Sequence, residues 1–228
     1  MASDLDNPIW NALNSRDSDK NIGSKDFAFF DAEIAPFIGM PSWDEKSQKK
    51  FFENVPSNRS WFLLMVDEIN FIDEIEIALS IPLYQFICPK LENSPACKKD
   101  MEIVALNENN IDEMIALTHL TKPGPFTKRT IEFGNYHGIF EDEKLVAMAG
   151  ERLHIDGYTE ISAICTHPDY RGLGFGAKMT HYLAASVFQK GQIPFLHVRA
   201  DNSRAQDVYK RLGFEIRSKI QFYIIRKK

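Results

Sequence analysis

The segment that most constrains the fold runs from Thr166 to Lys178 and reads THPDYRGLGFGAK. It joins a predicted strand, which ends at Thr166, to a predicted helix from about Gly174 to Gln189. Glycines let the backbone approach a ligand and turn its N–H groups outward. A helix start adds unpaired N–H groups and the positive end of a dipole. A strand, a glycine turn and a helix in this order therefore predict a site for an anionic group, commonly a phosphate.

Two other phosphate-binding motifs also carry glycines at such spacings. The run Gly172-Leu-Gly174-Phe-Gly176-Ala177 fits the dinucleotide fingerprint, and Asp201 follows the next predicted strand, near where a ribose-binding acid is expected. That fold needs further parallel strands after the fingerprint, whereas the short remainder of this chain predicts strand, helix, strand and strand. A P-loop needs Gly-Lys-[Ser/Thr], but Gly176 is followed by Ala-Lys-Met. A glycine turn that binds nothing is the remaining alternative.

The segment resembles motif A of the GCN5-related N-acetyltransferase (GNAT) superfamily, [Arg/Gln]-x-x-Gly-x-[Gly/Ala]. Arg171, Gly174 and Gly176 match its defined positions, and the preceding His-Pro-Asp-Tyr fits the usual lead-in. By this resemblance, backbone N–H groups from about Arg171 to Ala177 hold the pyrophosphate of coenzyme A. The resemblance implies acetyl-coenzyme A as the cosubstrate, with no metal ion.

A second segment, NSRAQDVYKRLGF from Asn202 to Phe214, resembles motif B of the superfamily, Asn-x-x-Ala-x-x-[Leu/Val]-Tyr-x-x-x-Gly-Phe. Asn202 and Tyr209 lie on one face of the predicted helix, because two helical turns separate them. Alone, Tyr209 would be interpreted as a core residue with its hydroxyl at the edge. The two motifs in the family's order favour an acyl-coenzyme A site, and the resemblance covers roughly residues 101–228.

The resemblance implies an α/β (α+β) fold of the GNAT type, in which helices flank a mixed, mostly antiparallel central sheet and a smaller α/β domain precedes it. Residues 89–100, PKLENSPACKKD, combine prolines with a charge run and predict a linker. We therefore divide the chain into an N-terminal domain, 1–100, and a GNAT domain, 101–228. Three sequence segments resemble the glycine N-acyltransferase-like branch of the superfamily: residues 122–126, 145–152 and 160–168. This resemblance implies that residues 1–100 are a degenerate half that shapes the acceptor site.

Local patterns in the N-terminal domain predict a helix and two strands. The segment from Trp43 to Val55 is expected to be helical, with Ser42 as its N-cap and Glu45 at the capping-box spacing. The apolar runs Trp61–Val66 and Ile77–Cys88 are predicted to be strands. Ahead of these elements, residues 1–26 are expected to form an arm or short helix.

In the GNAT domain, Asp156-Gly157 is a strong hairpin signal, and the prolines of residues 121–126 predict a loop. Helices are expected from Asn109 or Asn110 to Leu120, from Gly174 to Gln189 and from Ser203 to Leu212. Strands are expected over Met101–Leu106, Tyr136–Phe140, Leu145–Ile155, Tyr158–Thr166 and Ile193–Val198, then near Glu215 and over Ile220–Ile225.

The resemblance assigns roles to individual residues. Tyr209 would protonate the departing thiolate of coenzyme A, and a backbone N–H near Cys165 or Thr166 would stabilise the oxyanion of the transition state. The residues expected at the cofactor are Cys165, Thr166, Arg171, Gly172, Leu173, Gly174, Phe175, Gly176, Ala177, Asn202 and Tyr209.

Hairpin geometry suggests the general base. With Asp156-Gly157 as a two-residue turn and no bulge, Glu151 lies opposite Ser162, so Glu151 and Glu160 become diagonal neighbours on one face. Two nearby carboxylates that lose water raise one pKa, which suits a base. The alternative is an exposed polar face with two solvated acids. The same register puts His154 and Cys165 on the opposite face, so a Cys165 nucleophile would have no histidine beside it.

The bulk composition narrows the function classes. A net charge of −5 gives no electrostatic footprint for nucleic acid. No apolar run approaches the ~20 residues that cross a bilayer, and the acidic N-terminus does not resemble a signal peptide. Cys88, Cys97 and Cys165 are odd in number and are expected to be free thiols. The six histidines lack metal-site spacing. We therefore expect a cytoplasmic protein without nucleic-acid, membrane or metal partners, and a homodimer is left open.

These observations predict an N-acyltransferase that transfers an acyl group, most simply acetyl, to a primary amine of a small molecule or amino acid within a ternary complex. The alternative is a non-catalytic acyl-coenzyme A sensor that works through a partner. A sensor needs the phosphate loop but not the thiolate donor, so the presence of both Asn202 and Tyr209 favours the enzyme.

Overall fold

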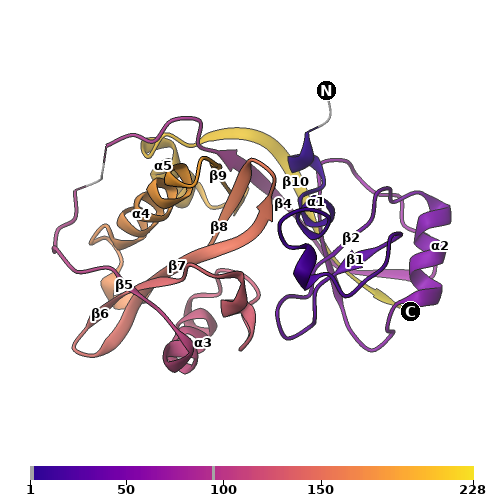
Figure 1. Cartoon of the computed structure of the whole chain (residues 1–228), viewed down its shortest axis with the longest axis horizontal. Helices are drawn as coiled ribbons and strands as arrows, with labels where there is room; N and C mark the ends of the chain where they lie inside the picture. The colour runs from indigo at the N-terminus through magenta and orange to yellow at the C-terminus, as the bar shows by residue number, and fades with distance from the viewer. Residues whose placement is uncertain (1–2, 94–95) are drawn as a thin grey trace.

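The computed structural model of the chain describes residues 3–93 and 96–228, and an eight-stranded sheet forms its centre (Figure 1). The strand order is β3-β10-β4-β9-β8-β7-β6-β5. Its strands are β3 (Trp61–Met65), β4 (Ile75–Ile87), β5 (Val104–Ala105), β6 (His137–Glu141), β7 (Lys144–Ile155), β8 (Tyr158–Thr166), β9 (Ile193–Arg199) and β10 (Glu215–Lys227). Two short strands, β1 (Ala28–Phe29) and β2 (Ile38–Gly39), form a separate ribbon.

The helices cover both faces of this sheet. They are α1 (Pro8–Leu13), α2 (Glu45–Asn54), α3 (Ile111–Thr121), α4 (Phe175–Gln189) and α5 (Ser203–Arg211). In Figure 1, α4 and α5 lie on one side of β7 and β8, and α3 lies on the other. Each side has its own hydrophobic core, one built on α1 and α3 and the other on α4 and α5. Neighbouring strands pair antiparallel, except for β8 with β9, so the predicted fold class is confirmed.

The N-terminal residues contribute strands to the same sheet. β10 pairs with β3 on one edge and with β4 on the other, and β4 also pairs with β9. In Figure 1, β4 and β10 run along the molecule from the α5 side toward α2. Continuous hydrogen bonding therefore crosses the predicted boundary near residue 100, and the division into two domains stays a prediction. In the predicted linker, residues 94 and 95 lie outside the described residues.

Three local predictions need correction. The N-cap of α2 is Asp44, whose carboxylate accepts the N–H of Ser47 at 2.8 Å, and the Ser42 hydroxyl only hydrogen-bonds Asp44. The final two predicted strands are one strand, β10, which bends at a bulge between Ile216 and Ser218 and so continues along β4. The strand predicted over Met101–Leu106 is reduced to the two residues of β5, and from Asn107 the chain turns into the short helix that precedes α3.

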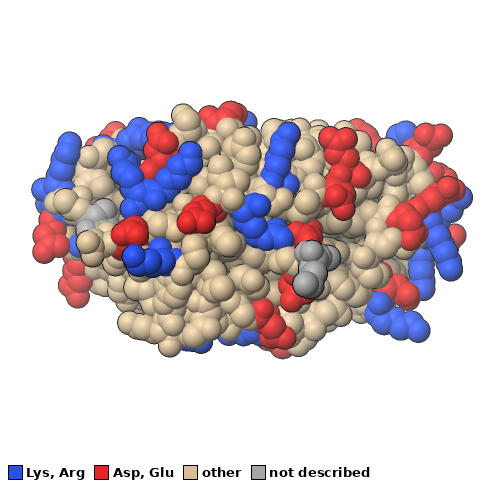
Figure 2. All heavy atoms as spheres, turned by 90° about the horizontal axis from the view of Figure 1, so that it is seen from above, with Lys and Arg blue, Asp and Glu red and all other residues tan. Residues whose placement is uncertain are grey.

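The other elements agree with the patterns. Asn202 caps α5, as expected of Asn or Ser at that start, and its side chain accepts the N–H of Ala205. Gly213 follows α5 in a left-handed conformation, with φ of 92°. The three cysteines are free thiols. No helix in residues 3–93 and 96–228 has the length and hydropathy needed to cross a bilayer. Figure 2 shows basic and acidic side chains interspersed on the face seen from above.

Candidate functional site

The site is a cleft that opens where β8 and β9 separate. The two strands pair in parallel only from Tyr158 to Glu160, opposite residues 193–195. Beyond Glu160 the two strands no longer pair with each other, and a cavity of 1170 Å³ lies at the split. This cavity is lined by residues 161–166 of β8, the glycine loop, α5, the loop after α3, and residues of β3, β4 and β10. An open split of this kind exposes backbone groups of β8 that a neighbouring strand would otherwise cover.

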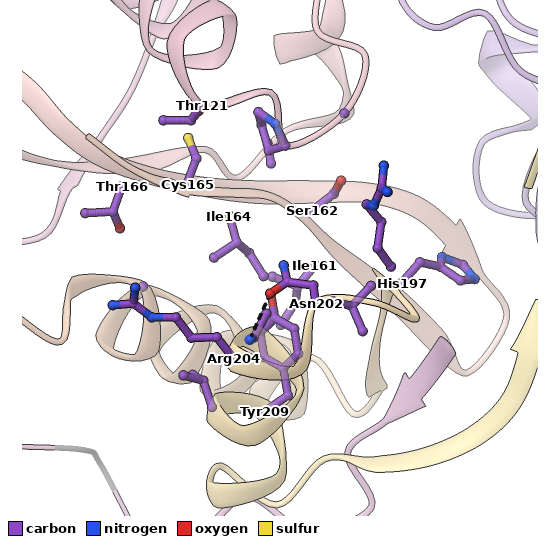
Figure 3. Close-up of a pocket in the computed structure, with 18 of the residues that line it drawn as sticks. Thr121, Ile161, Ser162, Ile164, Cys165, Thr166, His197, Asn202, Arg204 and Tyr209 are labelled. Carbon is purple, nitrogen blue, oxygen red and sulfur yellow. Dashed lines mark hydrogen bonds between the residues drawn. The ribbon is translucent and has the colours of Figure 1, made fainter. Parts of the chain in front are cut away.

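A bulge shapes the cleft wall. Between two regular pairs of the hairpin, Ala163 and Ile164 of β8 lie opposite a single residue of β7. Ala163 adopts a left-handed backbone conformation, with φ of 53°, which is uncommon for a residue other than glycine. In Figure 3, Cys165 points toward Thr121 of α3, while Ile164 and Thr166 point to the opposite side of the strand. The extra residue therefore re-aims the end of β8 into the cleft.

The glycine loop lies at one end of the cleft. Gly172 and Gly174 have φ of 84° and 96°, a region that other residues rarely adopt, so glycine is required there by the backbone. Gly174 is the N-cap of α4, and the first N–H groups of that helix have no partner within it. Both glycines, Arg171 and residues 175–177 line the cavity. The structure thus brings the predicted anion-binding residues to one place, except that Leu173 does not line the cavity and its carbonyl accepts the N–H of Lys98.

Asn202 and Tyr209 face the cleft from α5, as Figure 3 shows. The Tyr209 ring packs edge-on against Phe86, with ring centroids 6.1 Å apart, and only 8% of the residue is exposed. Burial raises the pKa of Tyr209, with no charged group or hydrogen bond offsetting it. At neutral pH the side chain is therefore a protonated phenol that can donate a proton into the cleft.

The charged side chains that line the cleft are all basic. Among the described residues, no aspartate or glutamate lines it. Six basic side chains do, from five different segments of the chain: Lys122, Arg152, Arg171, Arg199, Arg204 and Arg211. Arg199 is paired with Asp201 and Arg152 with Glu160. The cleft therefore favours anionic ligands, such as a nucleotide that carries phosphate groups.

Glu151 and Glu160 are not neighbours on one face, so that prediction is wrong. A register shift between His154 and Glu151 places Glu151 opposite Ile161, and the strand alternation then turns Glu160 to the other face. Neither glutamate lines the cavity, and both are buried, so the alternative of two solvated acids is wrong as well. Each carboxylate belongs to its own ion-pair network.

Glu160 lies beneath the cleft floor. It accepts hydrogen bonds from Arg152 at 2.5 and 2.8 Å, and its Oε1 lies 2.7 Å from Nδ1 of His197. Burial alone would raise the pKa of Glu160, but the Arg152 and His197 charges and hydrogen bonds outweigh it and lower the pKa to about 2. Glu160 reaches the cleft only through Arg152 and His197, which both line it.

Glu151 binds a different set of partners at the far side of β7. Its carboxylate accepts hydrogen bonds from Asn135 at 2.6 Å and Lys190 at 2.7 Å, and lies 3.2 Å from Nε2 of His154. Burial would raise its pKa, but these partners lower the pKa to about 2. The expectation that one of the two glutamates has a raised pKa is therefore wrong, and so is the placement of His154 away from Glu151.

Cys165 lines the cleft beside Thr121. Burial raises the pKa of its thiol to about 11, so the reactive thiolate is scarce at neutral pH. No hydrogen bond or ion pair joins Cys165 to a histidine among the residues that the structure describes. The arrangement gives no support to a covalent route through this residue.

The positions of Arg152, His197 and several aromatic side chains at the cleft were not predicted from the sequence. Arg152 and His197 come from β7 and β9 and meet only through Glu160, so no local spacing marks them. Phe37 and Phe62, which also line the cavity, belong to an apolar pattern that indicates a strand and a core equally well. Alternating apolar residues on Trp61–Met65 were the available signal for a sheet face, but not for its position at a cleft.

Comparisons with known proteins agree with this geometry. Residues 136–223 match the profile of a family described as FR47-like protein. A curated relative, mycothiol acetyltransferase of Mycolicibacterium smegmatis, is 27% identical over 132 residues. That match covers 51% of this chain and 43% of the relative, so the chain spans less than half of the length of this protein.

Solved structures extend the likeness to the whole chain. A protein from Novosphingobium aromaticivorans, assigned to the GNAT family of acetyltransferases, is 29% identical, with a TM-score of 0.89 and full coverage of both chains. A GCN5-related N-acetyltransferase from Kribbella flavida is 18% identical, with a TM-score of 0.61, covering 96% of this chain and 91% of the other. The second similarity, at 18% identity, concerns the fold alone.

Proposed function

Because the chain belongs to the GCN5-related N-acetyltransferase superfamily, we propose that it transfers an acetyl group from acetyl-coenzyme A to a primary amine. The observation that carries this proposal is the split between β8 and β9, which has the glycine loop on one side and Tyr209 on the other. A thioester whose phosphates lie at the loop would extend along β8 toward Tyr209. Transfer is proposed to be direct, within a ternary complex.

Several groups fit the coenzyme. The N–H groups at the start of α4 and the basic side chains of Arg171, Arg204 and Arg211 would bind its phosphates. The unpaired edge of β8 would hydrogen-bond the amide groups of the pantetheine arm, as an added strand does. The apolar side chains of Ile161 and Ile164 would pack against the arm itself.

We propose the backbone N–H of Thr166 as the oxyanion donor. The N–H of His167 donates to Val146 of β7 at 2.8 Å. Because N–H directions alternate along a strand, the N–H of Thr166 points away from β7, toward the open edge. A fixed donor at this position acts on the charge that develops on the thioester oxygen, which is where it lowers the barrier most.

In the proposed reaction, Tyr209 and solvent account for every proton that is transferred. The neutral amine attacks the thioester carbonyl, so a C–N bond forms and the oxygen becomes negative. As the carbonyl re-forms, the C–S bond breaks, and the departing thiolate takes the phenol proton of Tyr209. The new amide nitrogen loses its extra proton to solvent, and Tyr209 recovers its own. The products are the N-acetyl amine and free coenzyme A.

Glu151 and Glu160 are reassigned in this proposal. A carboxylate whose pKa is about 2 is a weak proton acceptor for an amine. We therefore propose that Glu160 positions Arg152 and His197 at the cleft floor, that Glu151 stabilises the packing of α4 on β7, and that the acceptor binds as the free amine. The pH dependence of kcat/KM for a Glu160→Gln variant tests this reassignment.

The test of the proposed function is release of free coenzyme A from acetyl-coenzyme A in the presence of a panel of amino acids, polyamines and aminoglycosides. Release that depends on an added amine, with the N-acetyl product identified by mass spectrometry, supports the enzyme. Tight binding of acetyl-coenzyme A without release for any amine or acyl chain length would instead support the sensor. The position of the Tyr209 phenol in the cleft favours the enzyme, since binding alone needs no proton donor there.

A further inference from the structure

One wall of the cleft is apolar and is built from the adjacent strands β3, β10 and β4 of the central sheet. Side chains on one face of three adjacent strands line the cavity: Phe62 and Leu64 of β3, Phe222 of β10, and Ile81 and Leu83 of β4. Phe222 pairs with both Leu64 and Ile81, so these side chains form a continuous surface across the sheet. A wall of this composition gains free energy by burying an apolar group of a ligand.

Aromatic rings extend this wall. Phe62 packs edge-on against Phe222, with ring centroids 5.4 Å apart, and against Phe37, at 6.2 Å. These three rings form a row. Phe37 at its end is almost fully buried and so is held in place, whereas Phe62 and Phe222 are half-buried. The two half-buried rings therefore offer edges and faces to an apolar or aromatic side chain of a substrate.

Arg152 lies at the end of this row, with its guanidinium 4.9 Å above the Phe37 ring. Glu160 occupies Nε and one hydrogen of Nη2. Within the part of the chain that the structure describes, Nη1 has no hydrogen-bond partner, and it is not among the buried atoms that lack one. Because Arg152 lines the cavity, the free edge of its planar guanidinium can donate two parallel hydrogen bonds to a carboxylate.

The charge of the cleft excludes one class of acceptor. Its lining combines the basic side chains named above with no acidic side chain among the described residues. A polyamine or aminoglycoside would bring several positive charges into this surrounding without a carboxylate to pair them, which is unfavourable. Because Arg171, Arg204 and Arg211 are assigned to the phosphates of the coenzyme, a negative group on the acceptor would pair with Lys122 or with the free edge of Arg152.

We propose that the acceptor is a free apolar α-amino acid, whose carboxylate binds Arg152 and whose side chain packs on Phe62 and Phe222. This inference rests on the proposed function, since it names the substrate class of that site. The α-amine then lies between Arg152 and the end of β8, near Ser162, and is acetylated by the step given above. Glycine, which lacks a side chain for the wall, is expected to be a poorer acceptor.

Matched acceptors test the two contacts separately. With the wild-type chain, kcat/KM is expected to be highest for L-phenylalanine or L-leucine and about 10- to 100-fold lower for L-phenylalaninamide, which keeps the side chain but loses the carboxylate. Glycine is expected to fall below phenylalanine by a similar factor because it buries no apolar surface. Spermidine is expected to be the poorest of the panel.

Variants then connect the preference to named residues. Arg152→Gln combined with Glu160→Gln removes the guanidinium without leaving a buried carboxylate unpaired, and is expected to abolish the preference for phenylalanine over its amide. Phe62→Ala is expected to raise KM for phenylalanine while leaving the value for glycine nearly unchanged. Arg226→Gln, which removes an exposed arginine paired with Glu76, is the control and is expected to change neither ratio.

The outcomes separate this inference from the proposed function. Equal rates for phenylalanine and its amide, or spermidine as the best acceptor, would overturn the amino-acid inference while leaving an amine acetyltransferase. Calorimetric titration of the coenzyme A-bound chain with L-phenylalanine reports acceptor binding apart from turnover. Binding that disappears in the double variant supports the inference even without turnover, and no binding with no turnover of phenylalanine overturns it.

Discussion

The carboxylate of Glu160 and the imidazole of His197 lie 2.7 Å apart where β8 and β9 separate, with Glu160 in the last residue pair of the two strands and His197 two residues beyond that pair. Nε2 of His197 lies 3.0 Å from Gln85 on β4, so three neighbouring strands are joined by one polar network beneath the cleft. Fully satisfied buried networks of this kind hold side chains in a single geometry. The network thereby fixes the point from which the cleft opens.

Glu160 makes the stability of the chain depend on acidic pH. Its pKa is about 2 in the folded chain and 4.5 as the ordinary value, so the carboxylate stabilises the fold above pH 4.5 and this contribution is lost as pH falls toward 2. We expect Glu160→Gln to lower the urea midpoint at pH 7, and the difference from wild type to shrink below pH 4.5. A difference that stays constant from pH 7 to pH 3 would contradict the lowered pKa.

The rate profile of the same variant distinguishes a positioning residue from a base. If Glu160 only positions Arg152 and His197, Glu160→Gln lowers kcat/KM but keeps the rise with pH that reports deprotonation of the amine. A base would remove or shift that rise. The profile is to be measured from pH 6 to pH 9.5 with saturating acetyl-coenzyme A, and a variant with full activity at every pH would exclude both roles.

His154 produces the opposite dependence at alkaline pH. Burial would lower its pKa, but hydrogen bonds to Asp17 and Glu151 raise the pKa to about 9. A raised pKa means that the stabilisation is complete below pH 6.5, the ordinary value, and is lost as pH rises through 9. We expect the melting temperature to fall between pH 7 and pH 9.5, by roughly 2–4 °C for each kcal/mol lost.

The control for this prediction is His154→Gln, which keeps a hydrogen-bonding side chain but does not titrate. Its melting temperature is expected to be lower than that of wild type at pH 6.5 and to depend less on pH up to 9.5. Because Asp17 follows α1 and His154 is on β7, the variant also reports how firmly the N-terminal segment is held. Parallel curves for the two proteins would show that another group titrates.

Most of the fold, and the residues of the glycine loop and α5 that meet at the cleft, could be predicted from the sequence, because both depend on local chemistry. A strand, the glycines at 172 and 174 and a helix are contiguous, so their pattern is visible along the chain. Tyr209 was predicted in the same way, through its spacing from Asn202. The residues that line the proposed acceptor site come from β3, β4, β7, β9 and β10, which only the tertiary fold brings together.

The wrong pairing of Glu151 and Glu160 has a physical cause of the same kind. A hairpin register can be counted from Asp156-Gly157 only while the strands stay regular. The register shifts before it reaches Glu151, and the bulge at Ala163 shifts it again. A bulge without glycine leaves no mark in composition, so the alternation rule gave the wrong face.

Tyr209→Phe is predicted to separate chemistry from binding. The ring fills the same space against Phe86 and Phe214, so the fold and the affinity for coenzyme A are expected to stay close to wild type. Loss of the phenol proton is expected to lower kcat by about 100- to 10,000-fold when expulsion of the thiolate limits the rate. Stopped-flow detection of free thiol measures this directly. An unchanged kcat at all pH values would remove Tyr209 from the mechanism.

Three glycines, two of them in the glycine loop and the start of α4 and one after α5, offer a graded test of local backbone strain. Gly172→Ala meets no atom within 4 Å but must adopt φ of 84°, and is expected to cost about 1–2 kcal/mol of unfolding free energy. Gly213→Ala adds a clash to a similar φ of 92°, because its Cβ would lie 2.1 Å from the carbonyl oxygen of Lys90. The backbone at Lys90 would have to move, so this variant is expected to be the least stable.

Gly176→Ala is the control. Gly176 lies inside α4, and the added Cβ would lie 3.7 Å from Oγ1 of Thr166, so this variant is expected to be neutral or slightly stabilising. Urea unfolding without ligand measures the order, and a Gly213→Ala variant as stable as Gly172→Ala would mean that the segment after β4 yields without cost.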